Sequence, residues 1–585
     1  MVENNPANEP KADAKDESKV EAAKRNSRHL RGTIAESLAA DTTHFDKGDI
    51  GLLKFHGTYQ QDNRDERHEN RKKGLEESFQ FMVRCAIPAG ILTADQYLAM
   101  DGLAGRFANG SLRVTTRQGF QLHGVLKENL KSAIAGINHT LLTTLSACGD
   151  VERNVMGCPA PLDDEAHATV RRVAREIAVQ LRPASNAYHE IWLDGEKVVS
   201  TEQEEPFYGD VYLPRKFKSG IALADDNCID VYSMDAGLIA IVEGEQLVGY
   251  NVVVGGGLGM THGKADTVAK LAEPLGFVDP ENAVETVRTI AAIFRDYGNR
   301  EDRRHARLKY VLMEWGIEKF REEFRRRALF DLHDWRPIPE PVCHDHLGRN
   351  RQDDGNWFYG IFIENGRIKD ANGFRMRTAL RKIVEDYRPS LRLTPHQNVL
   401  LTGLSEQDND GIESIMLEHG VKSVEQLSAA RRFSMACPAL PTCGLAMSES
   451  ERLMPDVVDM FEAELTSLGM RDEPISLRMT GCPNGCARPY TADIAFVGRR
   501  PDVYHVYVGG GLPGNRVVDL YAADVATDQL VATLRPLLRS WAEHRKPRES
   551  FSDYYQRVLG RAAPRQVITG REEPTLELVQ LRIGN

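Results

Sequence analysis

An internal repeat constrains the fold of this chain more than any other feature of its sequence. LRVTTRQGFQLHG at residues 112–124 aligns with LRLTPHQNVLLTG at 391–403, with identical Leu, Arg, Thr, Gln and Gly residues. VGGGLGM at 254–260 recurs as VGGGLPG at 508–514, in the same order along the chain. Chance similarity between short strands is the alternative explanation. The shared order favours two diverged halves, roughly 50–335 and 345–570.

Strand and helix patterns are mixed without a regular βαβ order. Alternating apolar residues predict strands over 111–125 and 247–257. Apolar residues at helical spacing predict helices over 164–181 and 448–468. This mixture favours an α+β fold over a doubly wound parallel sheet.

The composition excludes several classes of protein. The 585 residues, 41% of them hydrophobic, are enough for several domains with large cores. A formal net charge of −11 argues against a nucleic-acid-binding protein, which normally has a basic domain or stripe. The sequence also lacks an apolar run of about 18 residues, which a transmembrane helix needs.

The N-terminal stretch, residues 1–48, is polar and mixed in charge, with few aromatic residues. It begins MVENNPANEPKADAKDESK, which lacks the apolar core of a secretory signal. We therefore expect a disordered tail on a cytoplasmic protein that binds neither nucleic acid nor membrane.

Four of the nine cysteines lie between residues 437 and 486, with the spacing C-x5-C, then 38 residues, then C-x3-C. Four thiolates on two loops can bind either zinc or an iron–sulfur cluster. The gaps are wider than the C-x2-C of zinc knuckles, which favours a cluster, and buried free thiols are a third alternative. The remaining cysteines are scattered, and we expect them to be buried free thiols: Cys85, Cys148, Cys158, Cys228 and Cys343.

The first half carries cations where the second half carries thiols. We match YLPRKFKSG at 212–220 to the TGCPNGC loop at 480–486, so that basic residues replace cysteines. Lys216 and Lys218 would point to the same side of an extended segment. Further basic residues with apolar neighbours and few nearby acids are Arg84, Arg113, Arg117 and Arg153. Each alone could be an ordinary surface residue, but together they indicate an anion pocket facing a redox centre.

The glycine-rich stretch VVVGGGLGMTHGK at 252–264 does not complete a dinucleotide-binding or Walker motif. A tight exit from a strand explains its glycines better. We therefore expect the chain to receive electrons from a partner protein.

Together these segments resemble the sulfite/nitrite reductase hemoprotein family, whose members carry sirohaem coupled to a [4Fe–4S] cluster. The resemblance covers about residues 50–560 and is strongest to the assimilatory sulfite reductase branch. It rests on these segments, in family order: KFHGTYQQDNRD, LRVTTRQGFQLHG, YLPRKFK, VGGGLGMTHG, GNREDRRHARLKY, SMACPALPTC and TGCPNGCARPY.

The resemblance implies a pseudo-twofold α+β fold, in which two ferredoxin-like half-domains are flanked by two sirohaem- and cluster-binding domains. After the tail at 1–48, the expected divisions are 49–145, the first half-domain, and 146–335, the first sirohaem-binding domain with the substrate anion site. The second half-domain would span 345–425, and the [4Fe–4S]/sirohaem-binding domain 426–570.

The resemblance also implies roles for individual residues. The cluster ligands would be Cys437, Cys443, Cys482 and Cys486, with Cys486 also binding the sirohaem iron. Sirohaem, which carries many carboxylates, would be held by Arg113, Thr115, Arg117, Gln121, His123, Arg215, Lys309 and Asn484. Sulfite would be bound, and protons delivered to it, by Arg84, Arg153, Lys216 and Lys218.

The implied reaction is the six-electron reduction of sulfite to hydrogen sulfide. Nitrite reductases of this family tend to have Asn at the second position of the K-x-K pair, so Lys218 favours sulfite over the alternative, nitrite. The electron donor would be ferredoxin or an NADPH-dependent flavoprotein subunit, and the two cysteine motifs look somewhat closer to ferredoxin-type members. A zinc-stabilised binding protein is the alternative from another class.

Overall fold

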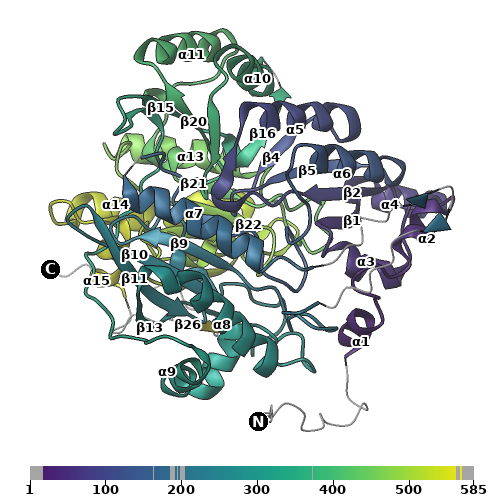
Figure 1. The fold of residues 1–585 in the computed structure, drawn as a ribbon. Helices are drawn as coiled ribbons and strands as arrows, with labels where there is room; N and C mark the ends of the chain where they lie inside the picture. The colour runs from purple at the N-terminus through teal and green to yellow at the C-terminus, as the bar shows by residue number, and fades with distance from the viewer. Residues whose placement is uncertain are drawn as a thin grey trace.

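The computed structural model describes residues 18–162, 164–184, 205–371 and 373–560, with the backbone of three short strands at Trp192–Leu193, Glu196–Lys197 and Val567–Thr569. Within this part of the chain, four five-stranded sheets packed against helices form the body of the molecule (Figure 1). The mixture of sheets and helices confirms the predicted α+β fold.

Two of the sheets contain the repeated strand pairs. Their strand orders are β1–β2–β5–β4–β16 and β14–β15–β20–β19–β3. The strands are β1 (Thr58–Asp62), β2 (Phe79–Arg84), β3 (Ile91–Leu92), β4 (Leu112–Val114), β5 (Phe120–Val125), β14 (Gly348–Arg351), β15 (Trp357–Ile361), β16 (Arg367–Ile368), β19 (Ser390–Leu393) and β20 (Val399–Leu404). The helices of this region are α5 (Ala94–Phe107), α6 (Leu130–His139), α10 (Met376–Tyr387) and α11 (Glu406–Glu418).

These two sheets exchange their edge strands. β16 belongs to the second half of the sequence but pairs with β4 of the first, where Arg367 lies opposite Arg113 (Figure 1). β3 belongs to the first half but pairs with β19 of the second. One hydrophobic core contains residues of both halves, from 45–137 and from 359–421. Each half therefore needs the other to complete its sheet.

The other two sheets share one topology, with strand orders β13–β11–β10–β9–β6 and β25–β24–β23–β22–β21. In each, three parallel strands are followed by two antiparallel ones. The strands are β6 (Met156–Gly157), β9 (Ser219–Leu223), β10 (Ala236–Glu243), β11 (Gln246–Val254), β13 (Glu273–Val278), β21 (Ser434–Ala436), β22 (Leu477–Thr480), β23 (Ile494–Arg500), β24 (Val503–Val508) and β25 (Asp519–Ala526). The repeated topology confirms the duplication.

Long helices accompany each of these sheets. The first sheet packs with α7, and α8 and α9 lie beside it; the second packs with α13 and α14. Their bounds are α7 (Glu165–Gln180), α8 (Ala283–Tyr297), α9 (Leu308–Arg327), α13 (Met454–Ser467) and α14 (Leu530–His544). In α7, the apolar stripe that predicted a helix over 164–181 faces the core, where Val170, Val173 and Ile177 are buried.

The strand registers align the two halves residue by residue. Ser219 of β9 lies opposite Ala236 of β10, and Leu477 of β22 lies opposite Ile494 of β23. The segments between these pairs have equal length and therefore align without a gap. The counterpart of the TGCPNGC segment is thus residues 222–228, which begin at the end of β9 and continue into the loop after it.

This alignment corrects the predicted match between the TGCPNGC loop and YLPRKFKSG. The basic segment at 212–220 leads into β9, whereas the cysteine loop leaves the equivalent strand β22. The prediction compared cations with thiols and had no information on strand register, which is what decides the match.

The two equivalent loops meet at a buried ion pair. Asp230 and Arg488 occupy the same position in the aligned halves, and both adopt a left-handed backbone with φ of 54°. A carboxylate oxygen of Asp230 lies 2.9 Å from Nε of Arg488 and 3.0 Å from Nη1 of Arg478. All three side chains are almost fully buried. The shared carboxylate neutralises two guanidinium groups and fixes one loop against the other.

The two GGG segments, residues 255–257 and 509–511, pack against the turns that follow the loops after β9 and β22. A Cβ atom at Gly256 would lie 2.3 Å from the carbonyl oxygen of Tyr232, and one at Gly510 would lie 2.5 Å from that of Ala492. Only glycine permits this contact, so its role is close packing between two backbone segments of this chain.

The prediction of a disordered tail at 1–48 is wrong for residues 18–48, and residues 1–17 lie outside the described chain. Helices α1 (Lys19–Arg25), α2 (Ile34–Ala39) and α3 (Lys47–Leu53) occupy or begin in this stretch. Glu21 pairs with Lys24 and Arg300, and Lys24 lies 3.7 Å from Asp150. Buried charges with partners in the body of the protein hold α1, which low average hydrophobicity does not reveal.

Replacing Asp230 by Asn should lower the thermal unfolding midpoint, because Arg478 and Arg488 would remain buried without their shared carboxylate. Removing one partner of a buried ion pair costs about 3–5 kcal/mol. The control is Asp386→Asn, which removes the exposed pair with Lys382 and should cost at most about 1 kcal/mol. Scanning fluorimetry of both variants measures the difference, and equal midpoints would contradict a central role for Asp230.

Candidate redox and anion-binding site

Four cysteines on two loops of the second half form one side of the site. Cys437 follows β21 directly, and Cys443 lies further along the same loop. Cys482 and Cys486 lie in the loop after β22, where the amide of Gly481 donates to Sγ of Cys437 at 3.4 Å. Because β21 and β22 are parallel neighbours, their carboxyl ends lie at the same sheet edge, which brings the two loops together.

The four thiols lie close enough to affect one another electrostatically. Burial raises the pKa of Cys437 to about 12, and the charge of Cys486 adds to the rise. Burial also raises the pKa values of Cys443 and Cys482, again with a contribution from Cys486. A bound metal cluster would stabilise the thiolates of Cys437, Cys443 and Cys482, which burial otherwise disfavours.

The spread of these cysteines counts against the zinc alternative. Among the described residues, no three of them have sulfur atoms within 4.8 Å of one another. A single tetrahedral zinc ion with Zn–S bonds of about 2.3 Å would draw the sulfurs to about 3.8 Å. The wider arrangement suits a cluster whose metal corners are separated.

Residues of the first half hold the cysteine loops in place. Arg64 donates to the carbonyl oxygens of Cys443 and Ala446 at 3.0 and 2.5 Å. Arg113 donates to the carbonyl oxygen of Ala436 at 2.7 Å and pairs with Glu451 at 2.9 Å. The expectation that acids are lacking near the basic residues therefore does not hold for Arg113, whose partner lies 338 positions away along the chain.

Cations of the first half form the other side of the site. Arg84 ends β2, Arg153 precedes β6, and Lys216 lies in the segment that enters β9. The charge of Cys486 acts on both Arg84 and Lys216, although other groups dominate the pKa of each, so both lie near this thiol. The structure thus brings predicted anion-binding residues and a predicted cluster ligand together.

Lys216 and Lys218 are half-buried lysines that lie near each other. Burial, together with Arg307, Arg215 and Arg153, lowers the pKa of Lys216 to about 7. Burial and Lys216 lower the pKa of Lys218 well below its usual value, although the nearby Asp235 opposes this. Within the described part of the chain, neither ammonium group has a hydrogen-bond or ion-pair partner. Two such groups side by side favour an anion between them.

Some of the side chains predicted to hold the macrocycle leave polar atoms unpaired. Nη2 of Arg117 donates to the carbonyl oxygens of Asn154 and Ser219, but its buried Nε has no partner among the described residues. The buried Nδ1 of His123 likewise has none. Burial lowers the pKa values of Arg117 and Arg215 to about 10. These atoms are available to carboxylates of a ligand.

Other predicted residues have internal partners. Oγ1 of Thr115 accepts from the amides of Arg117 and Gly119. Gln121, with its amide oxygen toward Arg84, accepts from Nε of that residue at 3.0 Å. Nζ of Lys309 donates to the carbonyl oxygens of Gly257, Gly259 and Val268, and the side chain is fully buried. Through these hydrogen bonds, Lys309 holds the backbone of the glycine-rich segment 254–260 in place.

Two further predicted residues lie at the edges of the site. A Cβ atom at Gly259 would lie 3.0 Å from the carbonyl oxygen of Asn484. The glycine-rich segment 254–260 therefore packs against the loop that carries Cys482 and Cys486. Nε of Arg153 donates to the carbonyl oxygen of Gly149 at 2.8 Å. Its guanidinium acts on the pKa values of Lys216 and Arg215, which places it beside the other cations.

The sequence analysis missed several residues of the site. Arg84 donates to Sγ of Cys148 at 3.0 Å, and its guanidinium lies 5.8 Å from the ring centroid of Tyr59. Burial and Cys148 raise the pKa of Tyr59 to about 12. Asp235 forms a buried pair with Arg307 at 2.7 Å and accepts from the amide of Lys218 at 3.0 Å. Tyr59 lies within the motif KFHGTYQQDNRD, but no residue spacing connects it to the site.

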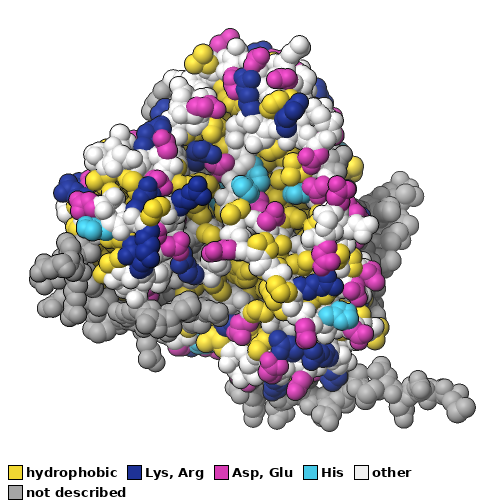
Figure 2. Space-filling view, turned by 90° about the vertical axis from the view of Figure 1, so that its left-hand side faces the viewer, with side chains coloured by type: hydrophobic (Ala, Val, Ile, Leu, Met, Phe, Trp, Pro, Cys, Tyr) yellow, Lys and Arg dark blue, Asp and Glu magenta, His cyan; other side chains and the backbone are white. Residues whose placement is uncertain are grey.

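This arrangement fits an electron-transferring metal cluster beside an anionic cofactor and an anionic substrate. Four thiols could supply cluster ligands on one side, and half-buried basic residues could supply counter-charges on the other. The outer surface differs from this interior: Figure 2 shows acidic and basic side chains interspersed on one face, without a continuous basic stripe. No helix of the described chain is long and apolar enough to cross a membrane.

Comparison with known proteins agrees with this geometry. Residues 173–330 and 429–559 match the family described as nitrite and sulphite reductase 4Fe-4S domain. Residues 74–139 and 349–419 match the nitrite/sulfite reductase ferredoxin-like half domain. The two family models together cover more than half of the chain, and each occurs once in each half.

Similar proteins match this chain over nearly their whole length. The sulfite reductase [NADPH] hemoprotein beta-component of Staphylococcus haemolyticus is 47% identical over 92% of this chain and 94% of the relative. That of Geobacillus kaustophilus is 45% identical over 92% and 95%. The solved structure of Mycobacterium tuberculosis NirA protein is 26% identical with a TM-score of 0.75, over 91% of this chain and 94% of the other. The chain therefore belongs to the nitrite and sulfite reductase family.

Proposed function

We propose that this chain is the hemoprotein component of an assimilatory sulfite reductase, which reduces sulfite to hydrogen sulfide with six electrons. The observation that carries the proposal is the pair Lys216 and Lys218, two half-buried amine groups that have no protein partner among the described residues, on the side of the site that faces Cys486. The names of the relatives at 45–47% identity support the same substrate.

The proposed cofactors are sirohaem and a [4Fe–4S] cluster bound by Cys437, Cys443, Cys482 and Cys486. When bound, they supply electrons at the face of the pocket that the cations line. Arg117, Arg215 and His123 have the free donor atoms or uncompensated charge that carboxylates of the macrocycle require. Lys309 and Arg113, whose donors already bind protein acceptors, would instead hold the surrounding loops.

The basic residues would bind and protonate the substrate. Arg84 and Arg153 supply fixed positive charge, because guanidinium groups stay protonated. Lys216, with a pKa of about 7, can give up a proton near neutral pH, which suits a general acid. Each oxygen of sulfite can then leave as water with protons from the lysines or from water that they orient.

For the electron donor, we propose an NADPH-linked flavoprotein rather than ferredoxin. The relatives named above are beta-components of NADPH-dependent enzymes, which implies a separate component that oxidises NADPH. The lack of a complete dinucleotide motif in VVVGGGLGMTHGK agrees with this division of labour. The slight likeness of the cysteine motifs to ferredoxin-type members is the weaker argument.

Turnover with defined donors tests this proposal. The purified protein should be coloured, contain acid-labile sulfide, and reduce sulfite faster with NADPH plus a sulfite reductase flavoprotein than with reduced ferredoxin. A colourless protein without acid-labile sulfide would exclude the redox function, and faster turnover with ferredoxin would reverse the assignment of the donor.

Replacing Lys218 by Asn should reduce kcat/KM for sulfite by about a hundredfold, the usual contribution of one acid–base group. The loss for nitrite should be smaller, because nitrite carries less charge and fewer oxygens to protonate. The control is Lys131→Asn, which changes an exposed lysine of α6. Steady-state kinetics with both substrates measure the ratio, and equal losses would contradict the proposed role of Lys218.

The pH profile should reveal the titration of Lys216. Only the protonated amine attracts the anion and donates a proton, so kcat/KM for sulfite should fall as the pH rises through about 7. In Lys216→Arg the side chain keeps its charge, and this fall should be reduced. Sulfite titrates identically in both assays, so the ratio of the two profiles isolates the lysine. A constant ratio between pH 6 and about 9 would contradict this assignment.

A further inference from the structure

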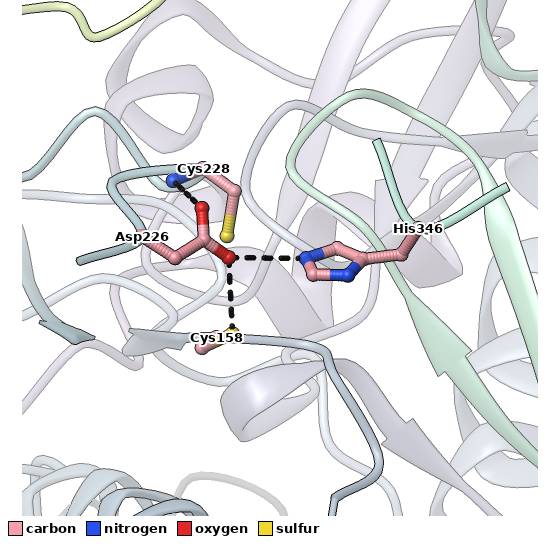
Figure 3. Close-up of side chains that lie close together, drawn as sticks. All are labelled: Cys158, Asp226, Cys228 and His346. Atoms are coloured by element: carbon pink, nitrogen blue, oxygen red, sulfur yellow. Dashed lines mark hydrogen bonds and ion pairs between the residues drawn. The ribbon is translucent and has the colours of Figure 1, made fainter. Parts of the chain in front are cut away.

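Four side chains outside the redox site converge where the first half meets the segment that connects the two halves: Cys158, Asp226, Cys228 and His346. Figure 3 shows them pointing toward a common centre from three separate segments. Their ligating atoms all lie within 4.8 Å of one another. Oδ2 of Asp226 lies 3.6 Å from Sγ of Cys158 and 3.1 Å from Nε2 of His346. Cys158 and Cys228 are only 2% and 1% exposed.

This cluster of side chains occupies the place that the redox cysteines occupy in the other half. The gap-free alignment of the loops after β9 and β22 matches Cys228 to Cys486. Cys158 follows β6 directly in MGCPA, and Cys437 follows the equivalent strand β21 directly in MACPA. The duplication therefore placed two cysteines at equivalent positions in both halves. Cys158 and Cys228 are buried free thiols in the structure, as expected, but their equivalent positions could not be read from their spacing in the sequence.

The donor set and its dimensions suit one zinc ion. Two thiolates, one imidazole and one carboxylate are all common zinc ligands, and four protein ligands make a closed structural site. Tetrahedral bonds of about 2.0 Å to nitrogen and oxygen and about 2.3 Å to sulfur place ligand atoms about 3.3–3.8 Å apart. The separations of 3.6 and 3.1 Å lie close to these edges. The cysteines of the redox site are more widely spread.

Neighbouring groups hold the four side chains ready for a cation. The amides of Cys228 and His344 donate to Oδ1 of Asp226, which leaves Oδ2 directed at the centre. The side chains of Cys228, His167 and His346 lie within hydrogen-bonding reach of Sγ of Cys158. His167 is itself oriented by Asp164, 2.6 Å away. Supporting contacts of this kind are typical around metal ligands.

We propose that Cys158, Asp226, Cys228 and His346 bind a structural zinc ion. The ion joins the loop after β9 to the segment that connects the two halves, where Asn227 and Val342 already share a backbone hydrogen bond of 2.9 Å. The same loop ends at Asp230, which pairs with Arg478 and Arg488 of the second half. Zinc at this place would fix the connection on which the alignment of the halves depends.

Metal analysis of the holoenzyme tests this proposal independently of its activity. Mass spectrometry of the purified full chain, dialysed against a chelator, should find one zinc per chain in addition to the iron of the cofactors. X-ray absorption at the zinc edge should show two sulfur ligands at about 2.3 Å and two nitrogen or oxygen ligands at about 2.0 Å. Absence of zinc, even after growth with added zinc, would overturn the proposal. So would a further iron in place of zinc, or a Cys158–Cys228 disulfide found by thiol mapping.

Variants identify the ligands. Cys228→Ser and His346→Gln should each reduce the zinc content at least fivefold, while iron and acid-labile sulfide stay at the wild-type level. The matched control is Cys343→Ser, which removes a thiol in the same connecting segment whose contact is instead with His396, 3.6 Å away. Full zinc content in both ligand variants would contradict the assignment. If a variant does not fold, the zinc content and the absorption spectrum of the wild-type protein still decide the question.

Discussion

The buried carboxylate of Asp230 connects the two halves at the point where their functions differ. It pairs with Arg478 in β22 and with Arg488, two residues after Cys486. The loop that carries a predicted cluster ligand is therefore fixed by a charge from the half that supplies the cations. Since burying three charged groups is costly, the interaction is maintained only while both loops keep their geometry. The position of Cys486 relative to Lys216 depends on this constraint.

Duplication explains both the symmetry of the fold and the asymmetry of the site. The sheet that contains β9 and the sheet that contains β22 have identical strand topology. The sheet that contains β4 and the sheet that contains β19 exchange the edge strands β3 and β16. The loops on these sheets have diverged. One pair of loops carries the cysteines of the redox site, and the equivalent pair carries the proposed zinc ligands, while the segment entering β9 became basic. One ancestral arrangement thus supports an electron-transfer site and a structural site.

The sequence predicted the features that local patterns encode. The repeated motifs indicated the duplication, the spacing of four cysteines favoured a cluster over zinc, and basic residues with apolar neighbours indicated an anion pocket. It could not show contacts between distant segments. The pair of Arg113 and Glu451, the approach of Tyr59 to Arg84, and the meeting of Cys158 with His346 all join residues whose spacing carries no signal. The counterpart of the cysteine loop was misplaced because strand register is set by pairing in the sheet.

The exchange of edge strands also limits when the cofactors can enter the protein. The cations lie in the first half, the cysteines lie near the end of the second, and each half-domain sheet takes one strand from the other half. A nascent chain that has left the ribosome only as far as β13 contains Arg84, Lys216 and Lys218 but lacks both β16 and the cysteine loops. The pocket forms only after synthesis has passed Cys486. Insertion of the proposed cofactors therefore has to follow the synthesis of both halves.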